Sequence, residues 1–175
     1  MRMVSAAALC IPRFHDVLGD VMAHGHTHYW LHGGRGSTKS SFISLVLALL
    51  VVAFPFANAC VVRRFSNTLR DSVYQQVLWA VEALGLSAYF KAKLSPMEVV
   101  YLPTGQRIVS RGADDPLKLK GVKFTRGYCA VTWFAELDQF DGIEAVRSIL
   151  NSLRRGATTS GSSAATTRPR RCGAG

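Results

Sequence analysis

The residues best suited to chemistry lie in a glycine-rich stretch, Trp30 to Ser41, which reads WLHGGRGSTKSS. It separates a short run of β-strand character from a long apolar run of helical character. A glycine-rich turn in that place presents several backbone N–H groups to one point, and the positive end of the next helix dipole adds to them. Lys39 would supply a charge for the β- and γ-phosphates, and Ser40 a hydroxyl for Mg²⁺. The stretch predicts a site for a nucleoside triphosphate.

One position departs from the strict pattern G-x-x-x-x-G-K-[ST]. The pattern begins at Gly33 and demands glycine where this chain has Thr38, a β-branched residue with fewer backbone conformations. The alternative is a glycine-rich loop that merely precedes a helix. The context favours phosphate binding, because we expect a strand over Thr27–Leu31 and a helix over Ser40–Val52. The predicted cradle comprises Gly33, Gly34, Arg35, Gly36, Ser37, Thr38, Lys39, Ser40 and Ser41, with Ser40 as the ligand of a magnesium ion bound with ATP.

A second group of candidates follows a later apolar run, where Glu136 is the first acid after Trp133 and Phe134. It should emerge at the carboxyl end of the sheet, where open α/β sheets bind ligands. We predict Glu136 as the catalytic acid, and we interpret Asp138 and Asp141 as solvated acids of a turn. Arg35 inside the loop either offsets charge that develops during phosphoryl transfer or faces outward, and both interpretations stay open.

Histidine and cysteine point to no metal site. The histidines at positions 24, 26, 28 and 32 have no cysteine or carboxylate beside them to complete a zinc site. The cysteines at 10, 60, 129 and 172 form no C-x-x-C pair. The first three lie in apolar surroundings and are typical of reduced, packed thiols in a cytosolic protein.

The remaining pattern predicts alternating strands and helices, and hence an α/β domain with a mainly parallel sheet. Besides the elements above, we expect a helical lead-in within residues 1–26, a strand over Asn58–Arg64, an amphipathic helix from Ser66 to Leu84 with Gly85 as C-cap, a hairpin of Glu98–Leu102 and Arg107–Ser110, and a strand over Tyr128–Phe134 buried on both faces.

Size and charge narrow the classes of function. A chain of 175 residues can form one domain with a core, and a formal charge of +10 favours a polyanionic partner. The apolar run Phe42–Phe56 is 15 residues long, too short to cross a bilayer, so we expect a core helix and no membrane association. The short apolar N-terminus does not fit a signal peptide.

In several blocks the chain resembles the N-terminal ATPase domain of the large terminase subunit of tailed bacteriophages, of the PBSX-like type. The blocks are residues 28–44, 61–64, 112–121, 131–140 and 148–156, and the coverage is nearly continuous from residue 11 to 156. The resemblance implies a P-loop NTPase fold of the ASCE-like kind, a three-layer sandwich that is incomplete at its C-terminal end. In that family the variant loop with Thr38 fits.

The resemblance also implies a motor that couples ATP hydrolysis to translocation of double-stranded DNA into the capsid. Such a motor would work in the host bacterial cytosol as a ring-forming homo-oligomer with the phage portal and the small terminase subunit. By position, Lys39 and Ser40 would hold phosphate and Mg²⁺, Arg35 would be the loop arginine and Glu136 the catalytic acid. The family often has two successive acids here, and the first is Ala135 in this chain. The alternative is a catalytically inactive remnant that binds nucleotide, DNA or assembly partners without turnover.

The expected organisation is a lead-in over 1–26, a partial P-loop ATPase domain over 27–156 and a disordered tail over 157–175. The tail is rich in Thr, Ser, Ala and Arg and has no bulky apolar residue before Arg168. After residue 156 the resemblance stops and the nuclease domain of full-length terminases is absent. Our hypothesis is a truncated or frame-shifted gene product.

Overall fold

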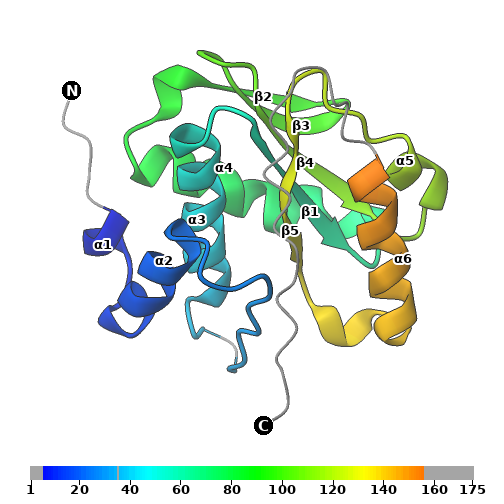
Figure 1. Cartoon of the computed structure of the whole chain (residues 1–175), viewed down its shortest axis with the longest axis horizontal. Coiled ribbons are helices and arrows are strands. Elements are labelled where there is room, and N and C mark those ends of the chain that lie inside the picture. The colour runs from blue at the N-terminus through cyan, green and yellow to red at the C-terminus, as the bar shows by residue number, and fades with distance from the viewer. Residues whose placement is uncertain (1–5, 35, 156–175) are drawn as a thin grey trace, which may run out of the picture.

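The computed structural model describes residues 6–34 and 36–155 and has three layers, a five-stranded sheet with helices on both faces (Figure 1). The main helices are α1 (Ala6–Leu9), α2 (His15–Met22), α3 (Lys39–Ala53), α4 (Gln75–Ala83), α5 (Pro116–Lys120) and α6 (Gly142–Arg155). The strands are β1 (Ala57–Arg63), β2 (Phe90–Leu94), β3 (Met97–Tyr101), β4 (Arg107–Gly112) and β5 (Tyr128–Phe134). Short helical turns are η1 (Pro12–Phe14), η2 (Ser66–Thr68), η3 (Arg70–Tyr74), η4 (Ser87–Tyr89) and η5 (Leu137–Gln139).

The sheet has the strand order β2-β3-β4-β1-β5. Strand β1 runs parallel to both β4 and β5, whereas β3 is antiparallel to β2 and β4. Four of the five strands therefore point the same way, which confirms the predicted α/β class with a mainly parallel sheet. The predicted hairpin is also confirmed, and Gly105 at its turn has a φ of 78°, which glycine adopts without steric cost.

The core lies in two apolar clusters, one on each face of the sheet. Alternate residues of β1 enter opposite clusters, because successive side chains of a strand point to opposite faces. Ala59 and Val61 pack with α3 and α4, while Cys60 and Val62 pack with α5 and α6. Most of α3 is buried, so the apolar run is the core helix that its sequence predicts. Within the described ranges, every helix is too short or too polar to cross a bilayer.

The predicted strand over Thr27–Leu31 is wrong, since these residues are irregular and belong to no ladder. A strand exists only where a neighbour supplies hydrogen bonds. Both sides of β1 are taken by β4 and β5, and the segment pairs with neither outer strand. Its Trp30 is 68% exposed, unlike a residue of an inner strand.

Two further expectations need correction. The helix expected from Ser66 starts as two short turns, η2 and the π-helical η3, before α4 begins. Strand β5 is not buried on both faces, because it is the outermost strand and Tyr128 is 52% exposed. The end of α4 agrees with the sequence: Gly85 has a φ of 71° and closes the helix with a hydrogen bond from its N–H to the Glu82 carbonyl.

Candidate functional site

The connections of the fold bring three chain segments to one edge of the sheet. Helix α3 is about 22 Å long and β1 about 23 Å, and only residues 54–56 separate them. The helix therefore runs back along the strand, and its amino end lies at the carboxyl end of β1 (Figure 1). Strand β5 is parallel to β1, so Glu136 beyond it lies at the same edge. Ligands of open α/β sheets bind at this edge.

Thr38 adopts the backbone conformation that the strict motif assigns to glycine. It precedes α3 with φ 57° and ψ 10°, in the left-handed region. That conformation is unfavourable for a β-branched residue. The loop keeps the glycine shape with a threonine in it, and its hydroxyl donates to the Ser37 carbonyl at 2.8 Å.

Lys39 folds over the loop. Its Nζ donates to the carbonyl oxygens of Gly33 and Gly34, at 2.5 and 3.1 Å, and to Ser37 Oγ at 2.5 Å. A Cβ on Gly33 would lie 3.2 Å from Ser37 Oγ and 3.4 Å from Lys39 Nζ, so a larger residue would crowd the ammonium. A lysine at the start of a 15-residue helix, over a loop that is rich in glycine, fits a bound phosphate chain.

The next serines are held differently from one another. Ser40 is exposed, so its hydroxyl is open to a ligand, while its carbonyl accepts from Ser44 Oγ at 2.8 Å. Ser41 Oγ accepts a hydrogen bond from Gln76 Nε2 of α4 at 3.2 Å. Ser40 therefore suits the predicted magnesium role, whereas Ser41 joins α3 to α4.

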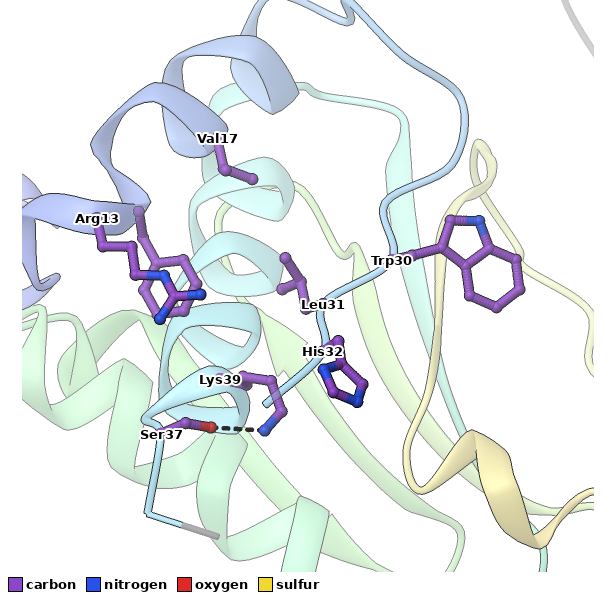
Figure 2. A pocket seen from close by; sticks show the side chains of 8 residues that line it. Arg13, Val17, Trp30, Leu31, His32, Ser37 and Lys39 are labelled. Carbon is purple, nitrogen blue, oxygen red and sulfur yellow. Dashed lines mark hydrogen bonds between the residues drawn. The ribbon is translucent and has the colours of Figure 1, made fainter. Parts of the chain in front are cut away.

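A pocket of about 370 Å³ adjoins the loop (Figure 2). Its lining comes from the lead-in, the segment before the loop and the loop itself: Arg13, Phe14, Val17, Trp30, Leu31, His32, Ser37 and Lys39. Phe14 is stacked on Phe42 of α3, with ring centroids 4.4 Å apart, which fixes the lead-in to the helix. In Figure 2 Lys39 and Ser37 lie at one end of the pocket, and the Trp30 indole points away from them.

Glu136 lies just beyond β5 and pairs with Arg63, the last residue of β1. Its backbone is left-handed, with φ 57° and ψ 60°, and its side chain is 46% exposed. Arg63 Nη2 donates to Glu136 Oε2, while Arg63 Nη1 donates to Ser72 Oγ at 2.6 Å and to the Thr68 carbonyl at 3.3 Å. The sequence reasoning missed Arg63 as a site residue, although two arginines ending a predicted strand were a usable signal.

The neighbours of Glu136 differ in their surroundings. Ala135 is buried in the α3-side cluster and donates its N–H to the Val62 carbonyl at 2.9 Å. The position where the family often has its first acid is thus an apolar core position here. Asp141 pairs with Arg64 at 2.7 Å and Asp138 is exposed, in line with surface acids of a turn. Among the described residues, no hydrogen bond or ion pair joins Glu136 to the loop.

One of the histidines, His26, contacts an acid of the lead-in. His26 Nδ1 lies 2.8 Å from Asp20 Oδ2, to which the Tyr29 hydroxyl also donates at 2.5 Å, and these partners lower the pKa of Asp20.

Cys10 and Cys60 are buried and Cys129 half-buried, as expected of packed thiols. Burial raises the pKa of each thiol, that of Cys129 to about 11, so the thiols stay protonated at neutral pH. Arg35 and the predicted tail lie outside the described residues.

Comparison with known proteins matches the family described as phage terminase large subunit to residues 25–170. The large terminase subunit of Bacillus phage SPP1 is 36% identical over 155 residues, which are 89% of this chain and 36% of that protein. The PBSX phage terminase large subunit of Bacillus subtilis is 29% identical over 143 residues, 82% of this chain and 31% of that protein. The chain spans about a third of the length of these relatives. It belongs to the phage terminase large subunit family.

Proposed function

We propose that the chain is the ATP-binding and ATP-hydrolysing module of a phage DNA-packaging motor, with a P-loop NTPase site that takes ATP and Mg²⁺. One observation carries the proposal: the Lys39 ammonium lies over the carbonyls of Gly33 and Gly34, at the amino end of α3 and beside an exposed Ser40. Helix dipole, lysine charge and hydroxyl together make a site for a triphosphate with its metal ion.

Each residue has a proposed role. Lys39 would exchange the loop carbonyls for the β- and γ-phosphate oxygens, and the N–H groups of residues 33–41 would bond the phosphates. Ser40 would bind Mg²⁺, which neutralises charge on the phosphates when bound. The pocket lined by Arg13 and Trp30 has the size of a small-molecule site and would take the nucleoside. Arg35 remains a proposed loop arginine.

Glu136 is the proposed acid that polarises the attacking water, and Arg63 is the residue that positions it. Arg63 Nη2 bonds one carboxylate oxygen of Glu136, Oε2, so Arg63 would hold the carboxylate while Glu136 turns its other oxygen, Oε1, toward the water. Its side chain is half exposed and has the room to do so. The buried Ala135 favours the second candidate function, a module that binds nucleotide without turnover.

Membership of the family also supports the wider expectations. We propose double-stranded DNA, the phage portal and the small terminase subunit as partners, a ring-forming homo-oligomer as the assembled state, and the host bacterial cytosol as the location. These belong to the whole terminase, of which this chain spans about a third.

Nucleotide binding and steady-state hydrolysis by the purified chain test the proposal. We expect Lys39→Ala to lose binding of a fluorescent ATP analogue by about 100-fold, because it removes the ammonium that lies over the loop. Glu136→Gln should keep binding and lose hydrolysis by about 100-fold or more. Glu144→Gln, an exposed acid of α6 paired with Arg147, is the matched control.

The results separate the candidates. Wild-type binding without hydrolysis would establish the inactive module, and absence of nucleotide binding would remove both. Hydrolysis that survives in Glu136→Gln would assign the acid to another residue.

A further inference from the structure

The sheet is covered by helices on only part of one face. The apolar cluster beneath α5 and α6 includes residues of β1, β4 and β5 and no described residue of β2 or β3. On the other face, Phe90, Met97 and Val99 of these two strands pack into the α3 and α4 cluster. Helix α6 lies near β5, at the end of the strand order opposite to β2 (Figure 1). On this face β2 is exposed at Lys91 and Lys93, while Glu98 of β3 is buried between Lys93 and Arg107.

Strand register places several cations on this face. Lys91 is opposite Val100, which is opposite Arg107 on the next strand. Lys93 is opposite Glu98, one row further along. Cross-strand partners and residues two apart share a face, so Lys91, Lys93 and Arg107 lie together. They share it with Glu98 and Val100.

Lys123 extends the group. It is exposed, and its backbone carbonyl accepts a hydrogen bond from Arg107 Nη2. We name Lys91, Lys93, Arg107 and Lys123 the basic sheet face. Its two rows contain one acid, Glu98, whose side chain is 3% exposed and already paired with Lys93 at 2.9 Å and Arg107 at 3.1 Å. The face therefore presents a net positive charge.

The edge that carries the nucleotide site has a different balance. There Arg63 pairs with Glu136 and Arg64 with Asp141, and the exposed Asp138 adds a further negative charge. At that edge a polyanion would meet arginines already paired with acids, the exposed Asp138 and the Lys39 ammonium bonded to loop carbonyls. On the basic sheet face it would meet Lys91 and Lys123, which have no ion pair among the described residues. Charge distribution of this kind steers polyanions to one surface.

We propose that the basic sheet face binds the phosphate backbone of double-stranded DNA. The choice of DNA among polyanions rests on the proposed packaging function. Lys91 and Lys93 are about 7 Å apart along β2, and adjacent strands about 5 Å apart, so the cations are spaced closely enough to contact several phosphates of a duplex. Backbone contacts carry no sequence information, which suits a motor that must move any sequence.

The face lacks the features of a single-strand site. Single-stranded nucleic acid is bound through aromatic side chains on which bases stack. In the two rows described above, the only side chains besides the cations and Glu98 are Val100 and Val109. The one ring beside these cations, Phe124 under Arg107, is buried and offers no surface for base stacking. An array of cations without exposed aromatic rings in its two rows fits the outside of a duplex.

Anisotropy of a labelled 30-base-pair duplex of mixed sequence, titrated with the full 175-residue chain from 50 to 200 mM salt, tests the proposal. The test variant is Lys91→Ala with Lys123→Ala, since neither ammonium pairs with a described acid and the fold should be unchanged. Each lost phosphate contact lowers the slope of log affinity against log salt by about 0.9. We expect a slope lower by about 2 and affinity at 50 mM salt about 10-fold weaker. Arg147→Ala on α6, also exposed, should bind as the wild type does.

The proposal is overturned if the double variant binds like the wild type, if Arg147→Ala loses as much affinity, or if the wild type binds no DNA. Equal affinity for a single strand, or equal competition by polyglutamate, would also overturn duplex DNA as the occupant. Nucleotide binding in the same samples separates the two proposals. If the double variant binds both nucleotide and DNA as the wild type does, only the proposal about the basic sheet face is rejected. If the wild type binds no nucleotide, the ATPase proposal is rejected.

Discussion

Two glutamates paired with arginine, Glu98 within β3 and Glu136 just beyond β5, show how the same chemistry can serve structure or function. Glu98 is almost fully buried and bonds both Lys93 and Arg107. Glu136 is 46% exposed, bonds one cation, Arg63, and has a left-handed backbone. A buried carboxylate bonded to two cations is fixed in place, whereas an exposed carboxylate with a single partner can exchange that partner for a ligand.

The arginines differ in a corresponding way. Arg107 stacks over the Phe124 ring at 5.3 Å and is part of the wall of the second cluster. The side chain of Arg63 is 11% exposed and its Nε has no hydrogen-bond partner among the described residues. Its other contacts reach Ser72 in the π-helical turn, a kind of turn that is frequent at functional sites. Arg63 therefore links Glu136 to a second element of the same edge.

The largest effect on stability should follow from Glu98→Gln. The change leaves two cations without their carboxylate, and we expect the free energy of unfolding to fall by about 2–4 kcal/mol. Urea denaturation measures this, with Glu136→Gln as the matched control, which should change stability by less than about 1 kcal/mol because the Glu136 carboxylate is 46% exposed to water. Equal losses in the two variants would abolish the distinction between the two glutamates.

A smaller effect is expected from Arg63→Lys. This change keeps the charge and loses the guanidinium group whose two Nη atoms contact Ser72 and Glu136 together. Steady-state ATP hydrolysis should fall about 10-fold, while affinity for the ATP analogue stays within about twofold, because Arg63 acts on the acid and not on the loop. Arg107→Lys is the control and should leave hydrolysis unchanged. Loss of nucleotide affinity in Arg63→Lys would contradict the positioning role.

The smallest effect concerns backbone strain, which the site edge has at Thr38 and Glu136 and the strand carrying Glu98 does not. Thr38→Gly should raise the free energy of unfolding by up to about 1 kcal/mol, since relief of the left-handed conformation exceeds the added freedom of glycine in the unfolded chain. His24→Gly, at another left-handed residue with φ 55°, is the control outside the loop and should give a similar gain. A loss of stability in Thr38→Gly would show that the hydrogen bond of the threonine hydroxyl stabilises the fold by more than the backbone strain destabilises it.

The sequence predicted the parts of the molecule that depend on local pattern. The apolar run after the loop is α3, the proline and glycine between Tyr101 and Arg107 mark a hairpin turn, and Gly85 ends a helix. The strand predicted over Thr27–Leu31 was wrong because a strand depends on an available neighbouring strand, and a pattern within five residues carries no information about that neighbour. The predicted burial of β5 on both faces was wrong for the same reason, since an apolar run has the same sequence pattern at the centre and at the margin of a sheet.

The candidate site divides in the same way. Residue types and spacing by themselves determined the α/β class and led to the proposed phosphate loop with Lys39 and Ser40 and the proposed acid Glu136, because helix dipole, glycine freedom and periodicity act over a few residues. Only the tertiary structure decided that Thr38 takes the glycine conformation, that Ala135 is a core residue, and that Arg63 bonds Glu136 from 73 positions away. Those features depend on which strands become neighbours, and strand pairing is settled by the burial of two cores on a common sheet.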